Sequence, residues 1–230
     1  PKTQAALLEA MEERTVTSLG RRFRLDPPLF FLATQNPIEQ EGTYALPAAQ
    51  CDRVMCNLLL AYPEKREEHD IMRLTVSCDA APLFPVLSHE RILNLLDIVR
   101  KVEISDEMIQ YAVALTRRSR PSHESAPSFI KDFVAWGVSP RAAQGMIVGG
   151  KARAMLQGRY RVSAMDIMSI AHPVMRHRII LNYRAEADGI TPDEIIDRLL
   201  ETTPAPEGSK KSVKTRKYAS KLYLSVTNRS

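Results

Sequence analysis

Leu29-Phe30-Phe31-Leu32-Ala33-Thr34, followed by Gln35-Asn36-Pro37, is the stretch that decides the fold. The six residues 29–34 carry no charge, are too few for a helix, and lie between Pro27-Pro28 and Asn36-Pro37, so they predict a buried central strand of an α/β sheet. Ligands of open parallel sheets bind outside the carboxyl ends of the strands, so Asn36 would face the site of chemistry. The alternative is that Asn36 only forms a turn before Pro37.

The residues around this stretch predict the rest of an α/β layer. Apolar residues at helical spacing predict an amphipathic helix over 3–14, and two alternating runs hinged at Gly20-Arg21 predict a β-hairpin over 15–25. After a polar loop, Pro47 can open a short helix carrying Asp52 and Arg53. Residues 57–61 predict a second buried strand.

The sequence after Tyr62-Pro63 is typical of a helical domain. Its segments have helical period, and each has its own start signal: Ser88, Ser105, Ser139-Pro140, Ser163 with Asp166, and Thr191 with Glu194. Periodicity is lost near residues 78–86. We therefore expect an α/β portion over 1–78, a helical domain over 86–203 and a separate tail over 204–230.

Charge and composition narrow the classes of function. The net charge is +5, but residues 208–230 hold seven basic residues and no acid, so the remainder carries −2. This balance disfavours a nucleic-acid-binding globular part and suggests a disordered basic tail. No apolar run is long enough to span a membrane, the first residues do not resemble a signal peptide, and three cysteines fit neither a redox pair nor a zinc pattern. We therefore expect a cytoplasmic protein with reduced, buried cysteines.

One motif match is misleading. Gly145-Met146-Ile147-Val148-Gly149-Gly150-Lys151 fits the spacing of a phosphate-binding loop, but Ala152 stands where a magnesium-binding Ser or Thr is needed. Ser139-Pro140 has already started a helix that we expect to reach about Gln157. The glycines are better explained by close helix packing.

Three polar residues suit phosphoryl transfer: Asn36 after a buried strand, Arg53 beside the next strand, and Arg141 in the first turn of a helix. An amide can orient an attacking water, and guanidinium groups can neutralise charge on a γ-phosphate. The helix N-terminus adds positive potential near Arg141. The alternative is that both arginines are solvated or paired with Asp52 and nearby acids.

Several blocks resemble the MoxR family of AAA+ ATPases. They are PKTQAALLEAM over 1–11, ATQNPIEQEGTY over 33–44, LPAAQCDR over 46–53, GVSPRA over 137–142, and the run from His172 to Arg184. The resemblance implies the C-terminal part of a AAA+ P-loop NTPase core, with an inserted hairpin at 15–25 and a helical lid from about residue 86. It assigns Asn36 as sensor 1, Arg53 as the arginine finger and Arg141 as sensor 2, with Arg141 also binding the nucleotide.

The resemblance also implies ATP and Mg²⁺ as cofactors and a homo-oligomeric ring, expected to be a hexamer. Its activity would be ATP hydrolysis coupled to remodelling or maturation of partner proteins, with von Willebrand factor A domain proteins as the expected partners. Nothing in this sequence matches the family's Walker A loop or Walker B acids, so we expect a fragment that is inactive alone. The rival hypothesis is a non-catalytic helical interaction module, or a nucleic-acid-binding module that uses the basic tail.

Overall fold

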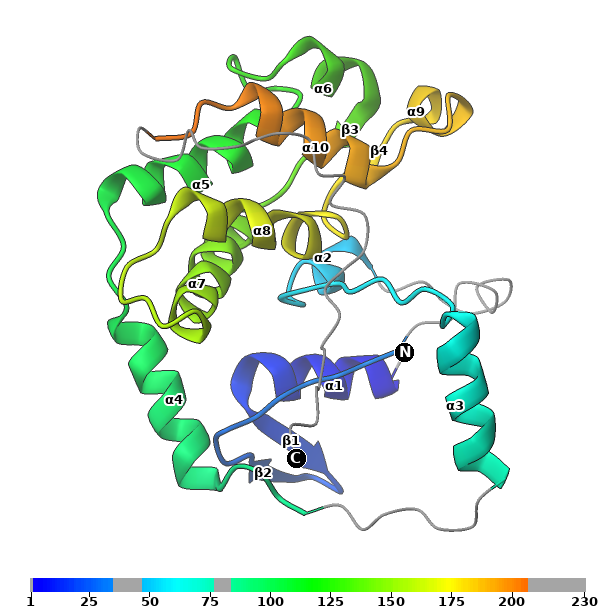
Figure 1. The fold of residues 1–230 in the computed structure, drawn as a ribbon, viewed down its shortest axis with the longest axis vertical. Helices are drawn as coiled ribbons and strands as arrows, with labels where there is room; N and C mark the ends of the chain where they lie inside the picture. The colour runs from blue at the N-terminus through cyan, green and yellow to red at the C-terminus, as the bar shows by residue number, and fades with distance from the viewer. Residues whose placement is uncertain (1, 35–46, 77–83, 207–230) are drawn as a thin grey trace.

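The computed structural model describes residues 2–34, 47–76 and 84–206, and Figure 1 shows the arrangement of their elements. Asn36, most of the expected boundary at 78–86 and nearly all of the basic tail lie outside the described residues. No helix in the described part is long and apolar enough to cross a membrane. The helices and strands are α1 (Lys2–Glu13), β1 (Thr15–Ser18), β2 (Arg21–Arg24), α2 (Ala48–Cys51), α3 (Lys65–Val76), α4 (His89–Lys101), α5 (Asp106–Arg118), α6 (Ser128–Phe133), β3 (Val134–Trp136), α7 (Pro140–Leu156), α8 (Ala164–Met175), β4 (Ile180–Leu181), α9 (Tyr183–Ala187) and α10 (Pro192–Thr202).

The predicted first helix and hairpin are confirmed. Strands β1 and β2 pair antiparallel with Thr15 opposite Arg24. Leu19 and Gly20 form the two-residue turn with φ of 51° and 74°, one position earlier than predicted. Positive φ at both central residues matches the twist of a tight hairpin. The Glu9 carboxylate of α1 fixes the hairpin by accepting hydrogen bonds from the Thr15 and Thr17 hydroxyls at 3.1 and 2.7 Å.

The two predicted buried strands are wrong for this structure. Residues 29–34 and 57–61 form no strand, and Leu32 and Leu60 are 98% and 92% exposed. A buried strand needs neighbours to pair its backbone N–H and C=O groups. No strand within residues 2–34, 47–76 and 84–206 pairs with either segment. The apolar side chains of these two segments favour burial, but the described residues provide no neighbouring strand that would bury them.

The predicted helix starts are largely confirmed. Ser88 and Ser139 cap α4 and α7 through their side chains, and Ser163 with Asp166 and Thr191 with Glu194 form capping boxes on α8 and α10. Ser105 precedes α5 without a side-chain capping bond. The short α6, β3, β4 and α9 were not predicted, because segments of two to six residues carry little periodic signal.

The described core lies among α5, α7, α8 and α10 (Figure 1). Leu115, Ile167, Met175, Ile195 and Leu199 are fully buried there. The false phosphate-loop match lies inside α7, as expected, and its glycines face α8. A Cβ at Gly149 would lie 2.8 Å from the Ile170 side chain, so the glycine permits the close approach of the two helices. Cys51 and Cys56 form no disulfide and are only partly buried, whereas reduced, buried cysteines were expected, and Cys78 lies outside the described residues.

Candidate functional site

The loop that starts α7 is fixed by the C-terminal end of α5. The Val138 N–H donates to Ser119 Oγ at 3.1 Å, and Arg120 Nε donates to the Val138 carbonyl at 3.0 Å. Gly137 lies so close to α5 that a Cβ would come within 2.3 Å of the Ser119 carbonyl oxygen. The loop therefore presents Ser139 and Arg141 from a rigid position.

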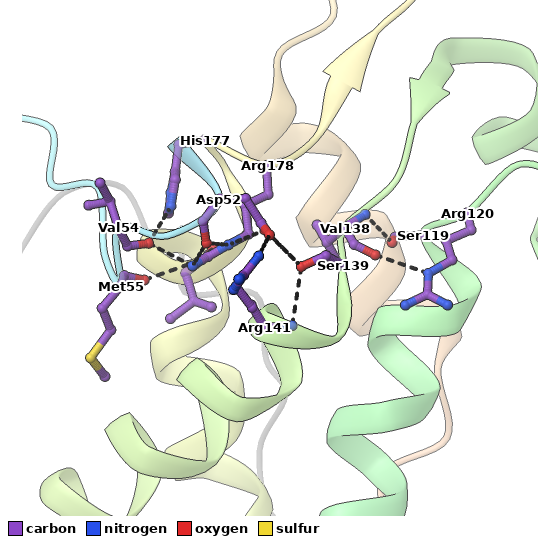
Figure 2. A network of polar contacts seen from close by, with 11 residues as sticks. Asp52, Val54, Met55, Ser119, Arg120, Val138, Ser139, Arg141, His177 and Arg178 are labelled. Atoms are coloured by element: carbon purple, nitrogen blue, oxygen red, sulfur yellow. Dashed lines mark hydrogen bonds and ion pairs between the residues drawn. The ribbon is translucent and has the colours of Figure 1, made fainter. Parts of the chain in front are cut away.

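Ser139 and Arg141 both contact Asp52, which lies just after α2. The Ser139 hydroxyl accepts from the Arg141 N–H at 3.2 Å and donates to the Asp52 carboxylate at 2.7 Å. Arg141 Nη1 donates to Asp52 Oδ2 at 3.1 Å. Figure 2 shows Asp52 between the start of α7 and the side chain of Arg178. Two segments 89 residues apart thus meet at one carboxylate.

Asp52 is held ionised by its neighbours. Burial by itself raises the pKa of this carboxyl group, but the hydrogen bonds from Ser139 and Arg141 and the charge of Arg178 outweigh burial. Its pKa is therefore lower than the ordinary 3.8. At neutral pH the cluster contains one carboxylate and two guanidinium groups.

Arg178 is the most enclosed member of this cluster, with a side chain that is 3% exposed. Its Nε donates to Asp52 Oδ1 at 3.1 Å, and its Nη2 donates to the carbonyls of Asp52 and Val54 at 3.0 and 2.6 Å. Nη1 donates to the Met55 carbonyl at 3.2 Å and also to the Val174 carbonyl in α8. A single guanidinium group thus attaches the turn after α2 to the end of α8.

Two neighbours of Arg178 extend this attachment. His177 Nε2 lies 3.0 Å from the Val54 carbonyl, and Arg176 Nη1 donates to the Asn57 carbonyl at 3.3 Å. The Asn57 N–H donates to the Pro173 carbonyl at 2.8 Å. The segment 52–57 is therefore docked on residues 173–178 by backbone and side-chain contacts.

The three sequence-predicted site residues have different outcomes. Arg141 lies in the first turn of α7, is 51% exposed, and pairs with Asp52. Arg53 is 28% exposed and forms an ion pair with Glu12 of α1. It lies after α2, which ends at Cys51, rather than within the helix as predicted. Asn36 lies outside the described residues, so its role stays a prediction.

Sequence reasoning missed Arg178 and understated Asp52. Pairing of the two arginines with Asp52 was predicted only as an alternative, and the structure shows it for Arg141 but not for Arg53. Nothing local indicated that Asp52 would also receive the guanidinium group of Arg178. The run Arg176-His177-Arg178 was the available signal, since two arginines around a histidine directly after an apolar helix are unusual in a core. Within the described residues, no group of three or more His, Cys, Asp and Glu side chains could hold a metal ion.

Comparisons with known proteins match both halves of the chain. Residues 1–56 match the model of the ATPase family associated with various cellular activities (AAA), and residues 128–199 match the AAA lid domain. Chaperone MoxR1 of Mycobacterium tuberculosis is 37% identical over 207 residues, which are 90% of this chain and 54% of that protein. Protein MoxR of Methylorubrum extorquens is 31% identical over 223 residues, covering 90% of this chain and 63% of the relative.

A solved structure supports the same grouping. An ATPase candidate from Cytophaga hutchinsonii superposes with a TM-score of 0.83 at 37% identity, covering 90% of this chain and 63% of that one. The chain thus spans between about half and two thirds of the length of these relatives. With a AAA match at its start, a AAA lid match at its end, and relatives named MoxR aligned along 90% of its length, the chain belongs to the MoxR family of AAA+ ATPases.

Proposed function

We propose that this chain works in a ring-shaped ATPase that couples ATP hydrolysis to the remodelling or maturation of partner proteins. Arg53 acts as the arginine finger on the nucleotide of a neighbouring subunit, Arg141 acts as sensor 2, and Asn36 orients the attacking water as sensor 1. The relative named a chaperone supports the remodelling role. Proteins with von Willebrand factor A domains are the partners we expect.

The observation that carries the proposal is the pairing of Arg141 with Asp52, the residue directly before Arg53. This contact ties the start of α7 to the segment that bears Arg53. We infer that both guanidinium groups serve the same nucleotide. A planar guanidinium offers paired donors that suit phosphate oxygens, and it stays charged throughout the physiological pH range.

Both arginines can be released toward a phosphate. Arg141 is half exposed, and its single carboxylate partner among the described residues is Asp52. If Arg141 leaves, Asp52 still accepts hydrogen bonds from Ser139 and Arg178. Arg53 has an exposed partner in Glu12, whose side chain is 45% exposed. One member of each pair, Arg141 or Glu12, is about half exposed, so water weakens both pairs and a multiply charged phosphate can compete for these guanidinium groups. ATP with Mg²⁺ would supply the transferable phosphoryl group.

The test is substitution of Arg53 in a ring whose chains also carry a phosphate-binding loop. An arginine finger is worth roughly 10³–10⁵ in rate, and lysine lacks the planar fork. We expect Arg53→Lys to lower kcat nearly as much as Arg53→Ala. Glu12→Gln is the matched control, since it removes the ion pair seen here and leaves the guanidinium. Equal damage from Glu12→Gln would assign Arg53 a structural role and contradict the proposal.

Mixed rings test whether Arg53 acts on a neighbour. Arg53→Ala chains combined with chains disabled in the phosphate loop should regain part of the turnover, because intact fingers then face intact pockets in some subunit pairs. Native mass spectrometry would establish that one ring contains both variants. No rescue in such rings would remove Arg53 from the proposed role.

A further inference from the structure

Arg178 occupies a position from which it can control the geometry of both arginines. We propose that Arg178 is a positioning residue: it fixes the turn after α2 against the end of α8, and thereby sets the direction in which Arg53 and Arg141 approach the nucleotide. This inference rests on the proposed function and adds to it a residue that touches neither nucleotide nor metal.

The contacts of Arg178 use its whole guanidinium group. Nε faces the Asp52 carboxylate, Nη1 faces two carbonyls from Met55 and Val174, and Nη2 faces the carbonyls of Asp52 and Val54. An arginine has five N–H donors in a fixed planar arrangement, so these acceptors match its capacity. A lysine ammonium offers three donors from one point and cannot reach acceptors spread around a plane.

These contacts bracket Arg53. The carbonyls of Asp52 and Val54, on either side of Arg53 in the chain, both accept from Nη2 of Arg178. The backbone of Arg53 is therefore held at both ends, and the starting direction of its side chain is fixed. The same guanidinium group holds the Asp52 carboxylate that pairs with Arg141 (Figure 2).

The burial of Arg178 explains why its contacts with the turn after α2 are stable. The Arg178 side chain is 3% exposed, so separating it from its acceptors would leave a charge in the protein interior. Arg141, by contrast, is 51% exposed and can leave Asp52 for another anion. The cluster thus has a fixed part, Arg178 with the turn, and an exchangeable part, Arg141.

A matched control exists in the same helical region. Arg159 holds the nearly inaccessible Asp166 through hydrogen bonds of 2.8 and 2.6 Å, and none of its hydrogen bonds or ion pairs within the described residues reaches the segment 52–57. Arg159→Lys should therefore disturb the stability of the helical region without moving Arg53. A difference between Arg178→Lys and Arg159→Lys in hydrogen exchange at residues 50–57 or in kcat therefore reflects the positioning of Arg53 rather than a general loss of stability.

The first experiment follows hydrogen exchange in this 230-residue chain by mass spectrometry. In Arg178→Lys, peptides covering residues 50–57 should exchange at least tenfold faster, because the Asn57 N–H loses its dock on the Pro173 carbonyl when the turn detaches. In Arg159→Lys, exchange of these peptides should match the wild-type chain. Unchanged exchange at 50–57 in Arg178→Lys would overturn the proposal, and this result does not depend on any ATPase activity.

The second experiment measures turnover in the assembled ATPase. Misplacement of a catalytic group by about 1 Å can cost about 10²-fold, so Arg178→Lys should lower kcat by roughly that factor while KM for ATP changes only a few-fold. Arg159→Lys should lower the melting temperature and leave kcat within a few-fold of wild type. A kcat for Arg178→Lys equal to that of Arg159→Lys would overturn the positioning role.

Two outcomes separate this inference from the proposed function. If Arg53→Ala retains full kcat, the arginine-finger role fails. If Arg53→Ala is inactive while Arg178→Lys is fully active, only the positioning role fails.

Should Arg178→Lys not fold, Asp52→Asn provides the second variant: it weakens the contacts to Arg178 and Arg141 and should produce the same pattern of faster exchange and lower kcat. Wild-type behaviour of a folded Asp52→Asn would also overturn the proposal.

Discussion

Gly137 lies where two backbones come too close for any side chain. A Cβ there would lie 2.3 Å from the Ser119 carbonyl oxygen and 2.7 Å from Arg120 Cα, both backbone atoms that cannot rotate away. At Gly149 the nearest atom is instead a side-chain atom, Cγ1 of Ile170 at 2.8 Å, which can move further than backbone can although the β-branched side chain is stiff. The same glycine-to-alanine change therefore has different consequences at the two positions.

We predict that Gly137→Ala lowers the free energy of unfolding by about 3 kcal/mol or more, the upper end of overpacking costs. Gly149→Ala should lower it by less, about 1–2 kcal/mol, because overpacking against the stiff Ile170 side chain is partly offset by the gain of about 1 kcal/mol in helix propensity. Urea unfolding of the two variants measures both values. Similar costs at the two positions would show that the loop between β3 and α7 is not held against the end of α5 as described.

His177 makes the docked segment sensitive to pH. Burial and the adjacent Arg178 charge lower the pKa of His177 below the ordinary 6.5. The unfolded chain then binds more protons than the folded chain between the folded pKa and 6.5. His177 therefore contributes stability that is complete above about pH 6.5 and is lost as pH falls through the folded pKa.

Because the pKa of His177 is lowered in the folded protein, we predict that the free energy of unfolding falls more in wild type than in His177→Gln when pH is lowered from 7.5 to 5.5. Denaturant unfolding at both pH values gives the change in the free energy of unfolding for each protein. The contributions of all other titratable groups are the same in both proteins and cancel when the two changes are compared. Equal losses in wild type and variant would mean that His177 titrates normally in the folded protein.

At the scale of elements, α8 depends on the charge at its N-terminus. Asp166 is 1% exposed and accepts from the Ser163 N–H at 2.9 Å, the Ser163 hydroxyl at 2.7 Å and Arg159 Nη2 at 2.6 Å. Burial raises the pKa of this carboxyl group, but the hydrogen bonds from Arg159 and Ser163 outweigh it, so the pKa is lowered from 3.8. Its stabilising contribution is therefore present above about pH 3.8 and is lost at lower pH.

We predict that Asp166→Ala lowers the free energy of unfolding by about 3 kcal/mol, the lower end of the range for breaking a buried pair. The lower end applies because Arg159 is 37% exposed and water can solvate part of it. Asp97→Ala is the control, since its pair with Arg100 is exposed and should contribute about 0.5 kcal/mol or less. Equal costs would contradict the structural role of Asp166.

At the scale of the whole molecule, the described residues supply guanidinium groups but no cradle for triphosphate. The only sequence match to a phosphate loop lies inside α7, and no cluster of acids suited to a metal occurs in the described ranges. Arg53 and Arg141 alone can attract a phosphate only weakly, because both are partly exposed to water.

We therefore predict that this 230-residue chain alone neither binds Mg-ATP in the micromolar range nor hydrolyses it. Calorimetric titration and a phosphate-release assay measure the two properties. Arg141→Ala provides the comparison, since it should abolish any weak binding that depends on the start of α7. Micromolar affinity in the unmodified chain would refute the prediction.

The sequence by itself determined the local features of this protein. Helix starts at Ser88, Ser139, Ser163 and Thr191 were predictable because a capping side chain bonds to a backbone group only two or three residues away. The hairpin was predictable for a similar reason, since its turn and its alternating strands are adjacent in the chain. The family could also be recognised from the sequence, because each of its motifs is a contiguous block of residues.

Tertiary structure decided what depends on partners far along the chain. The segment 29–34 has the sequence of a buried strand, but a strand forms only beside a neighbour, which no local pattern supplies. Asp52 and Arg178 are 126 residues apart, and each alone reads as an ordinary charged residue. Only folding brings them together, because the cost of burying Arg178 is offset when the carboxylate and the carbonyls of the turn surround it.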